Sequence, residues 1–241
     1  MNLLWQALSR HGFRVIAFDL RAHGASSGTL HLKTADMVGD IAAVIDFFRL
    51  QQVLVVGHAF GACLAFQYML RYPDARQHVQ SIVSLAGFVG SELHLVGHRG
   101  LTRRLLEWGV LQRLLRNRLY AWGYVSPLFG HKITPSLVRA YLDILLKRPL
   151  QRLKEPLREL AQTDLYSRLH QITVPVQVVC SRTDACTHPI HAVQLARQLP
   201  LADLTWIEDG SGNMLVWECP EQIANLVRHM EQRLHADALA S

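Results

Sequence analysis

Residues 53–61 read VLVVGHAFG, four apolar residues followed by a segment of small side chains around a histidine and a phenylalanine. The apolar run predicts a short strand over Val53–Val56 that is covered on both faces. From Phe60 to Arg71 the pattern is that of a helix. The stretch therefore predicts a buried strand that leads directly into a helix through Gly57 and Gly61.

The same succession of apolar strand and amphipathic helix recurs along the chain. Further strands are expected at Val15–Phe18, Ile82–Leu85, Val176–Val179 and Leu204–Ile207. Further helices are expected over residues 34–48, 189–198 and 219–235, with Thr34 placed to cap the first of them. Strands that are apolar throughout are typical of a parallel sheet, so the succession predicts a doubly wound α/β fold with right-handed crossovers.

The succession is interrupted between residues 88 and 172, where the pattern is helical. One side of the first predicted helix carries Leu101, Leu105, Trp108, Leu111 and Leu115, and the other carries Arg103, Arg104, Arg113 and Arg116. The interruption holds 14 Lys and Arg against 6 Asp and Glu, so its net charge is +8 and that of the remainder is −2. Open α/β sheets bind ligands at their strand ends, so we expect a helical lid over 88–172 on a core of 1–87 and 173–241.

Four segments resemble the α/β-hydrolase family, in particular its lipases and esterases. Residues 57–61 (GHAFG) resemble its nucleophile elbow, G-x-S-x-G, whose small flanking residues let the chain turn sharply and expose the central side chain. Residues 18–26 (FDLRAHGAS) resemble its D-x-R-G-x-G-x-S loop, with Ala22 where glycine is usual. Residues 180–184 (CSRTD) resemble its acid loop, and residues 210–221 (GSGNMLVWECPE) resemble its closing G-H-x-x-x-x-E-x-P-E segment. The resemblance implies an α/β-hydrolase fold with the lid inserted before the penultimate strand.

The resemblance also implies ester or acyl hydrolysis by a serine nucleophile, a histidine base and an orienting aspartate. In this chain Ala59 occupies the nucleophile position and Asn213 the base position, while Asp184 keeps the acid position. A methyl group cannot attack a carbonyl, and an amide cannot accept a proton at physiological pH. The backbone N–H of Phe60 is implied as one oxyanion donor. We therefore predict a relative of serine esterases that is catalytically impaired or inactive.

Four other side chains are candidates for chemistry near these positions. Ser211 and Cys63 are nucleophilic residue types, but neither is at the apex of the elbow. His58 is interpreted as a structural residue packed beside the turn, and His188 as a contact near the start of the helix at residue 189. None of the four is expected to restore catalysis.

In the family three strands precede the first helix, and the loop after the third supplies a second oxyanion donor. Met1 falls at the start of that helix, so the resemblance implies that the loop and these strands are missing. Strands 15–18 and 53–56 would then pair directly, accept another segment between them, or leave an exposed edge. Three accounts stay open: a naturally degenerate hydrolase, an active-site knock-out or truncated form of an active one, and a non-enzymatic ligand-binding or interaction module.

Composition excludes several classes of protein. The chain has 241 residues, half of them apolar, which is too hydrophobic for a disordered protein. No run approaches the roughly 18 apolar residues of a membrane span, and the first residues lack the layout of a signal peptide, so we expect a cytoplasmic protein. The four cysteines, which form no CxxC pair, are interpreted as reduced and mostly buried. No metal and no cofactor is expected.

The basic lid bears on partners. Its charge comes with no nucleic-acid-binding motif, so nucleic acid is not an expected partner. Because its arginines lie opposite Leu and Trp, the lid could contact an anionic membrane surface or an acidic partner. The simpler interpretation is that the arginines form a solvated outer face. A small apolar or acyl-ester ligand is the expected partner, and nothing indicates the oligomeric state.

Overall fold

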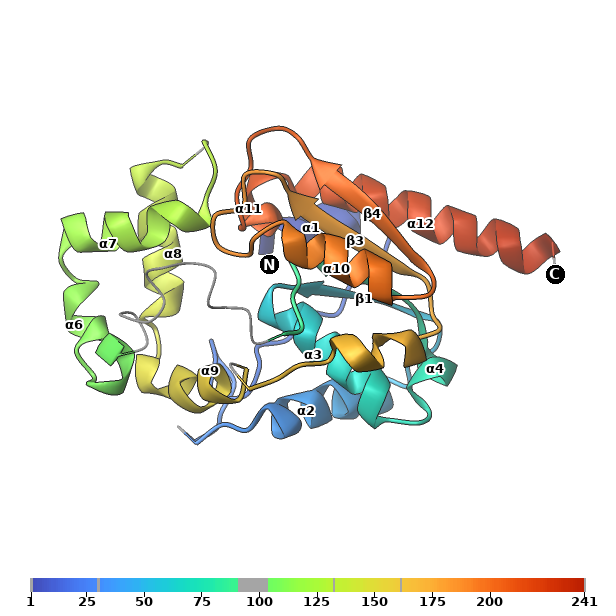
Figure 1. Cartoon of the computed structure of the whole chain (residues 1–241), viewed down its shortest axis with the longest axis horizontal. Coiled ribbons are helices and arrows are strands. Elements are labelled where there is room, and N and C mark those ends of the chain that lie inside the picture. The colour runs from blue at the N-terminus through green and yellow to red at the C-terminus, as the bar shows by residue number, and fades with distance from the viewer. Residues whose placement is uncertain (1, 30, 91–103, 132, 161, 241) are drawn as a thin grey trace.

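The strands of the computed structural model form one parallel sheet (Figure 1). The structure describes residues 2–29, 31–90, 104–131, 133–160 and 162–240. Within these residues the strands are β1 (Val53–His58), β2 (Val79–Leu85), β3 (Val176–Ser181) and β4 (Ala202–Ile207), in the spatial order β1-β2-β3-β4. The central strands β2 and β3 are almost entirely buried, as expected for apolar runs covered on both faces, whereas β1 is partly exposed.

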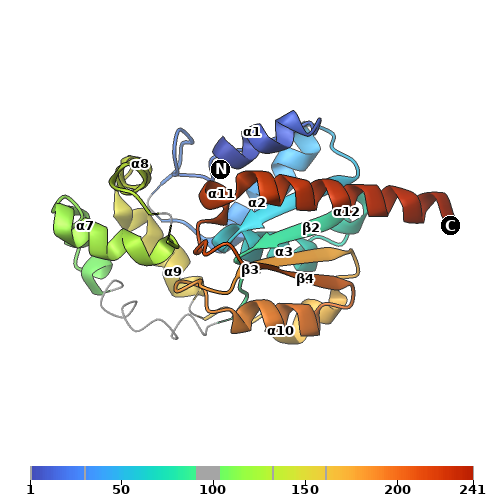
Figure 2. The same ribbon diagram turned by 90° about the horizontal axis from the view of Figure 1, so that it is seen from above.

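Helices cover both faces of the sheet and enclose two apolar clusters. One cluster is lined by α1 (Asn2–Arg10), α11 (Leu215–Glu218) and α12 (Pro220–Ala240). The other is lined by α2 (Thr34–Phe47), α3 (Phe60–Arg71), α4 (Ala75–His78) and α10 (Ile190–Gln198). Figure 2 shows α1 and α12 side by side. The predicted helices are confirmed within a few residues, and α3 has the predicted bounds.

The predicted strand at Val15–Phe18 is wrong. Residues 13–20 have no regular secondary structure, and within the described residues their backbone makes no ladder hydrogen bond to β1. A strand requires a partner for its N–H and C=O groups, and β1 pairs only with β2. Phe13 and Val15 instead pack beside the α1 and α12 cluster. Of the three expected arrangements, the structure shows the third: within the described residues, β1 is an edge strand without a neighbour on its outer side.

The capping role predicted for Thr34 is also wrong. Thr34 is the first helical residue of α2, and its hydroxyl is buried without a hydrogen-bond partner among the described residues. The Thr34 backbone N–H donates to Glu159 Oε2 over 2.6 Å. A carboxylate at a helix N-terminus satisfies a free N–H and interacts favourably with the helix dipole. Glu159, from a distant part of the chain, thus takes the role expected of a local hydroxyl.

Between β2 and β3 the described residues are helical, as predicted, and we call residues 104–171 the insertion. Its elements are α6 (Leu111–Leu114), α7 (Arg118–Val125), η2 (Ser126–Leu128), α8 (Pro135–Leu145), η3 (Leu150–Leu153), α9 (Lys154–Leu160) and η4 (Tyr166–Gln171). Figure 1 shows α6, α7 and α8 at the end of the molecule opposite the C-terminus. Leu101 and Arg103, named in the predicted pattern, lie outside the described residues. No helix in the described ranges has both the length and the apolar composition needed to cross a bilayer.

A buried arginine holds the end of α8. Arg152 is only 3% exposed, and its guanidinium group donates to the backbone carbonyls of Leu145, Arg148 and Pro149. The carbonyls at the C-terminus of a helix lack intrahelical partners and interact favourably with a cation. Arg148 in turn donates to the carbonyls of Gly24 and Ser26 in the 18–26 loop. The insertion is therefore attached to the core by backbone contacts as well as by apolar packing.

Candidate functional site

Ala59 lies at the apex of a strained turn between β1 and α3. Its φ is 49° and its ψ −111°, a conformation that a residue with a Cβ rarely adopts. Its N–H donates to the Leu85 carbonyl over 2.8 Å, which ties the turn to β2. A Cβ on Gly57 would lie 2.6 Å from the Ala62 backbone, so only glycine fits there, whereas a Cβ on Gly61 would meet nothing within 4 Å. The turn therefore leaves the side chain at position 59 partly exposed, and there is open space beside Gly61, two residues further on.

Asp184 and Asn213 form a buried hydrogen-bonded pair, and each is 3% exposed. Asn213 Nδ2 donates to Asp184 Oδ2 over 2.9 Å and to Thr187 Oγ1 over 3.2 Å. Asp184 Oδ1 accepts from the backbone N–H groups of Cys186 and Thr187, each over 2.7 Å. The carboxylate is thus oriented toward position 213, and both hydrogens of the Asn213 amide are used within the acid loop.

His58 links the turn to the loop that carries Asn213. Its Nε2 lies 2.9 Å from the Asn213 backbone carbonyl. Because a carbonyl only accepts, Nε2 is the protonated nitrogen. Burial lowers the pKa of the His58 imidazole below its usual value of 6.5, which keeps the ring neutral near pH 7. His58 therefore positions the loop that carries Asn213 relative to the turn at Ala59.

The other nucleophile candidates are held in structural contacts. Ser211 is fully buried and donates its hydroxyl to Asp209 Oδ1 over 2.5 Å. Cys63 is fully buried, and this burial raises the pKa of its thiol to about 11. His188 is exposed, and its Nδ1 accepts from the Ile190 N–H at the start of α10. None of these side chains lies at the apex of the turn.

An apolar cluster surrounds the turn. Cys63, Phe88 and Leu160 form its buried part, and Ala59 and Phe60 pack against it. Leu160 belongs to α9, so the insertion contributes directly to the surroundings of Ala59. The backbone N–H of Phe60 makes no hydrogen bond to any part of the chain that the structure describes. A free donor and an apolar surface therefore lie together at the start of α3.

Glu218 joins the insertion to the loop of Asn213, a role that the sequence analysis missed. Its Oε1 accepts from the Gly130 N–H and its Oε2 from the Gly212 N–H, each over 2.8 Å. A Cβ on Gly130 would lie 1.8 Å from the Gly210 carbonyl oxygen, so the two backbones are in direct contact. The glutamate of the closing segment was visible in the sequence, but its partner Gly130 is 88 residues away.

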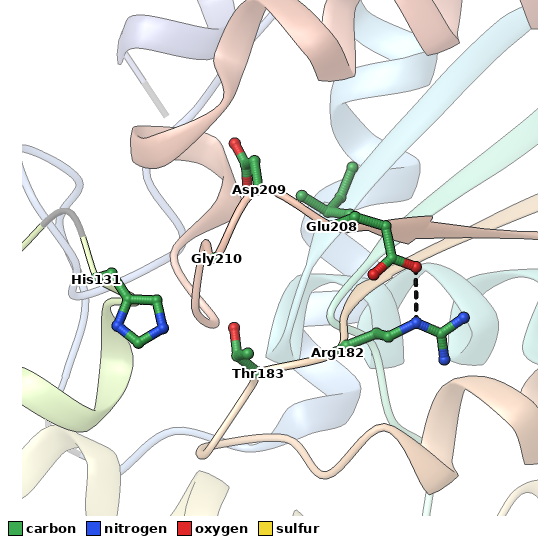
Figure 3. A pocket seen from close by; sticks show the side chains of 7 residues that line it. His131, Arg182, Thr183, Glu208, Asp209 and Gly210 are labelled. Carbon is green, nitrogen blue, oxygen red and sulfur yellow. Dashed lines mark hydrogen bonds and ion pairs between the residues drawn. The ribbon is translucent and has the colours of Figure 1, made fainter.

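A pocket of about 390 Å³ is lined in part by residues of these loops (Figure 3). Its lining residues are His131, Arg182, Thr183, Ile207, Glu208, Asp209 and Gly210. Arg182 Nε donates to Glu208 Oε1 over 2.6 Å, and the guanidinium carbon lies 4.4 Å from the centre of the Trp206 ring. Thr183 donates to the Ser211 carbonyl. Of the lining residues, Arg182 and Glu208 are thus paired with each other, and Thr183 with the neighbouring Ser211. Within the described ranges, no cluster of three or more His, Cys, Asp or Glu could hold a metal ion.

Comparisons with known proteins identify the family and agree with the fold. A family model described as "Alpha/beta hydrolase family" matches residues 2–226, so the chain belongs to that family. The structure of the esterase EaEST from Exiguobacterium antarcticum aligns with a TM-score of 0.82 at 18% identity, covering 95% of this chain and 85% of that one. A thermophilic esterase from Thermogutta terrifontis aligns with a TM-score of 0.78 at 20% identity, covering 96% and 85%. A candidate carbamate hydrolase, RutD of Escherichia coli O9:H4 (strain HS), is 28% identical over 201 residues, 77% of this chain and 71% of that protein.

Proposed function

We propose that this chain binds a small apolar or acyl-ester ligand at the Ala59 turn without hydrolysing it. The observation that carries the proposal is the pair of side chains at positions 59 and 213. Ala59 presents a methyl group at the apex, and both N–H groups of the Asn213 amide are donated to Asp184 and Thr187. Nucleophilic ester hydrolysis needs an attacking oxygen or sulfur and an adjacent base. Neither side chain supplies one, so a bound ester stays intact.

The groups that remain at the turn favour binding of a carbonyl compound. Phe60 is the first residue of a helix of 12 residues, and its N–H makes no hydrogen bond to the described residues. The N-terminus of a helix favours an oxygen that carries partial negative charge. Phe88 and Leu160 provide an apolar wall beside it. An acyl ester, or a carbamate of the kind named for RutD, combines a carbonyl with an organic substituent and matches both features.

We propose further that residues 88–172 act as a lid on this site, carried by a core of residues 1–87 and 173–241. Leu160 supports this assignment because it packs in the cluster that surrounds Ala59. The hydrogen bond from the Thr34 N–H to Glu159 supports it as well, because it fixes α9 on the core next to Leu160.

Two alternative accounts retain hydrolysis. If the chain is an active-site knock-out of an active serine hydrolase, Ala59→Ser together with Asn213→His restores ester turnover. If another nucleophile acts, turnover by the unaltered protein depends on Cys63 or Ser211. The burial of Cys63, the raised pKa of its thiol and the hydrogen bond from Ser211 to Asp209 argue against the second account.

The test separates binding from turnover. The unaltered protein is incubated with p-nitrophenyl acetate, p-nitrophenyl octanoate and a p-nitrophenyl carbamate, and we expect no release of nitrophenol above buffer. Binding of the octanoate ester is measured by calorimetry. Gly61→Leu fills the open space beside the turn and should abolish binding, whereas Gly123→Leu, at another glycine with open space, should not. Turnover that is lost in Cys63→Ala or Ser211→Ala, or equal binding by both glycine variants, would contradict the proposal.

A further inference from the structure

Residues 104–122 of the insertion expose large apolar side chains to solvent. Trp108 is 68% exposed, Leu119 86% and Trp122 39%. Isolated exposed apolar residues are ordinary on protein surfaces, but two tryptophans and a leucine within 15 positions of the chain are not. The same stretch also packs inward, through Leu111 and Leu115. The exposed apolar residues are therefore additional to those that this stretch uses for its own core packing.

The geometry of α7 places two of these residues on one face. Asn117 caps the helix by accepting from the Leu119 and Tyr120 N–H groups over 3.0 and 3.1 Å. Leu119 and Trp122 are three positions apart, so they are neighbours on the helix surface. Ala121 and Val125 are buried on the other side. The helix thus has a buried apolar face and an exposed apolar face.

Four arginines in the same stretch of chain have no partner among the described residues. Arg104, Arg113, Arg116 and Arg118 are exposed, and none of their guanidinium groups makes a hydrogen bond or an ion pair with the described residues. Glu107 is the one acidic residue in 104–122. Arg118 lies four positions before Trp122, so the two are neighbours on the surface of α7. The surface combines unneutralised positive charge with indole and leucine side chains.

The position of these elements makes the surface accessible. Figures 1 and 2 both show α6 and α7 at the extremity of the molecule, beyond α8 and opposite the C-terminal end of α12. No strand and no helix of the core lies outside them in either view. A flat partner can therefore reach this end without displacing the core.

We propose that residues 104–122 dock on an anionic phospholipid bilayer. Charge complementarity selects anionic headgroups, because four arginines face one glutamate in this stretch. Trp side chains are favoured at the boundary between headgroups and acyl chains, and an exposed leucine gains by entering it. Arginines can keep their guanidinium groups among the phosphates while their aliphatic stems lie along the apolar side chains. This docking goes beyond ligand binding at Ala59 and does not depend on it.

The experiment uses the full chain and two kinds of vesicle, phosphatidylcholine alone and an equal mixture of phosphatidylcholine and phosphatidylglycerol. We expect co-sedimentation with the mixed vesicles only, and weaker binding as salt is added. Arg113→Gln, Arg116→Gln and Arg118→Gln together should reduce affinity by about 100-fold, at roughly fivefold for each arginine near the surface. Leu119→Ser with Trp122→Ser should reduce it further. The control pair is Phe47→Ser with Arg197→Gln, both exposed residues of the core.

A spectroscopic readout guards against variants that fail to fold. Binding should shift tryptophan emission to the blue, and Trp108→Phe with Trp122→Phe should remove the shift while the protein still sediments with the vesicles. The proposal is overturned by absence of binding to mixed vesicles, by equal loss in the control pair, or by binding that is indifferent to salt. Salt-sensitive binding to polyglutamate without binding to vesicles would assign the surface to an acidic protein instead.

Discussion

Asn213 Nδ2 lies 2.9 Å from Asp184 Oδ2, so a buried carboxylate holds the amide of the loop whose backbone His58 ties to the turn at Ala59. In the triad of a serine hydrolase, the group hydrogen-bonded to such a carboxylate is an imidazole whose second nitrogen takes the proton of the nucleophile. The amide has no second nitrogen. Under the proposed function, the Asp184 carboxylate therefore acts only as a hydrogen-bond acceptor for this amide and the neighbouring backbone.

Because the backbone at Ala59 is strained, we expect a substitution by glycine there to stabilise the fold rather than destabilise it. Because Ala59 has φ 49° and ψ −111°, Ala59→Gly should relieve a conformation that disfavours any Cβ and stabilise the fold by about 1 kcal/mol. Ala62→Gly, within α3, should destabilise it by about 1 kcal/mol. Urea unfolding measures both. Destabilisation by Ala59→Gly would show that the turn is not strained.

Restoring the two side chains should restore reactivity at the apex. We expect Ala59→Ser with Asn213→His to be labelled by a fluorophosphonate probe at least tenfold faster than Ala59→Ser alone, because the imidazole acts as base for the hydroxyl. Labelling is followed by intact-protein mass spectrometry. Adding Asp184→Asn to the double variant is the control and should slow labelling again. Equal rates in the single and double variants would mean that position 213 does not reach the apex.

Asp184 should matter for stability even without catalysis. Asp184→Ala removes the acceptor of the Cys186 and Thr187 backbone N–H groups and of the Asn213 amide, and leaves buried donors unsatisfied. We expect a loss of about 2–4 kcal/mol in the free energy of unfolding. Asp203→Ala, which breaks an exposed ion pair with Arg233, should cost less than about 1 kcal/mol. Similar losses in both variants would contradict the structural role of Asp184.

Glu218 should control the local stability of two separate loops at once. Glu218→Gln replaces one accepting oxygen by an amide nitrogen that faces a backbone N–H, so one of the bonds to Gly130 and Gly212 is lost. Hydrogen exchange should become faster in residues 128–131 and in residues 210–214 together. Glu221→Gln, at an exposed partner of Arg10, should leave both segments unchanged. Faster exchange in only one of the segments would argue against coupling through the carboxylate.

The pKa of His58 predicts how stability depends on pH. Burial lowers this pKa in the folded state, so the unfolded chain binds more protons when the pH falls below about 6.5. The contribution of His58 is therefore complete above pH 6.5 and is lost as the pH falls toward the folded-state value. His58→Gln should flatten the change in unfolding free energy between about pH 7.5 and pH 5.5. An unchanged slope in His58→Gln would refute the assignment.

The sequence was sufficient where local pattern decides structure. The helix from Phe60 to Arg71 has the predicted bounds because an apolar strand, two glycines and a helical pattern succeed one another without competing signals. Val15–Phe18 has an equally apolar pattern, but a strand also needs a neighbour, and β1 does not supply one. For Thr34 the local cap was replaced by Glu159, 125 residues further along the chain. A contact between residues so far apart in the chain cannot be predicted from a local sequence pattern.

At the site, the pattern predicted residue types but not their contacts. It placed Ala59, Asp184 and Asn213 at three related positions, and the structure brings Asp184 and Asn213 into hydrogen-bond contact. It did not predict that His58 contacts the Asn213 carbonyl or that Glu218 bridges two loops, because both depend on the relative placement of distant segments. The exposure of Trp108, Leu119 and Trp122 was equally hidden, since helical periodicity cannot distinguish an inward apolar face from an outward one.

The hydrogen bond between the Thr34 N–H and Glu159 has a consequence for synthesis of the protein. The two groups are 125 residues apart, so the first turn of α2 leaves the ribosome long before its acceptor does. At about 5–20 residues per second, the nascent chain waits several seconds or more with that N–H open to water. Only after α9 has left the exit tunnel can Glu159 accept from this N–H. Translation order thus makes the completed N-terminus of α2 a late feature in the maturation of the chain.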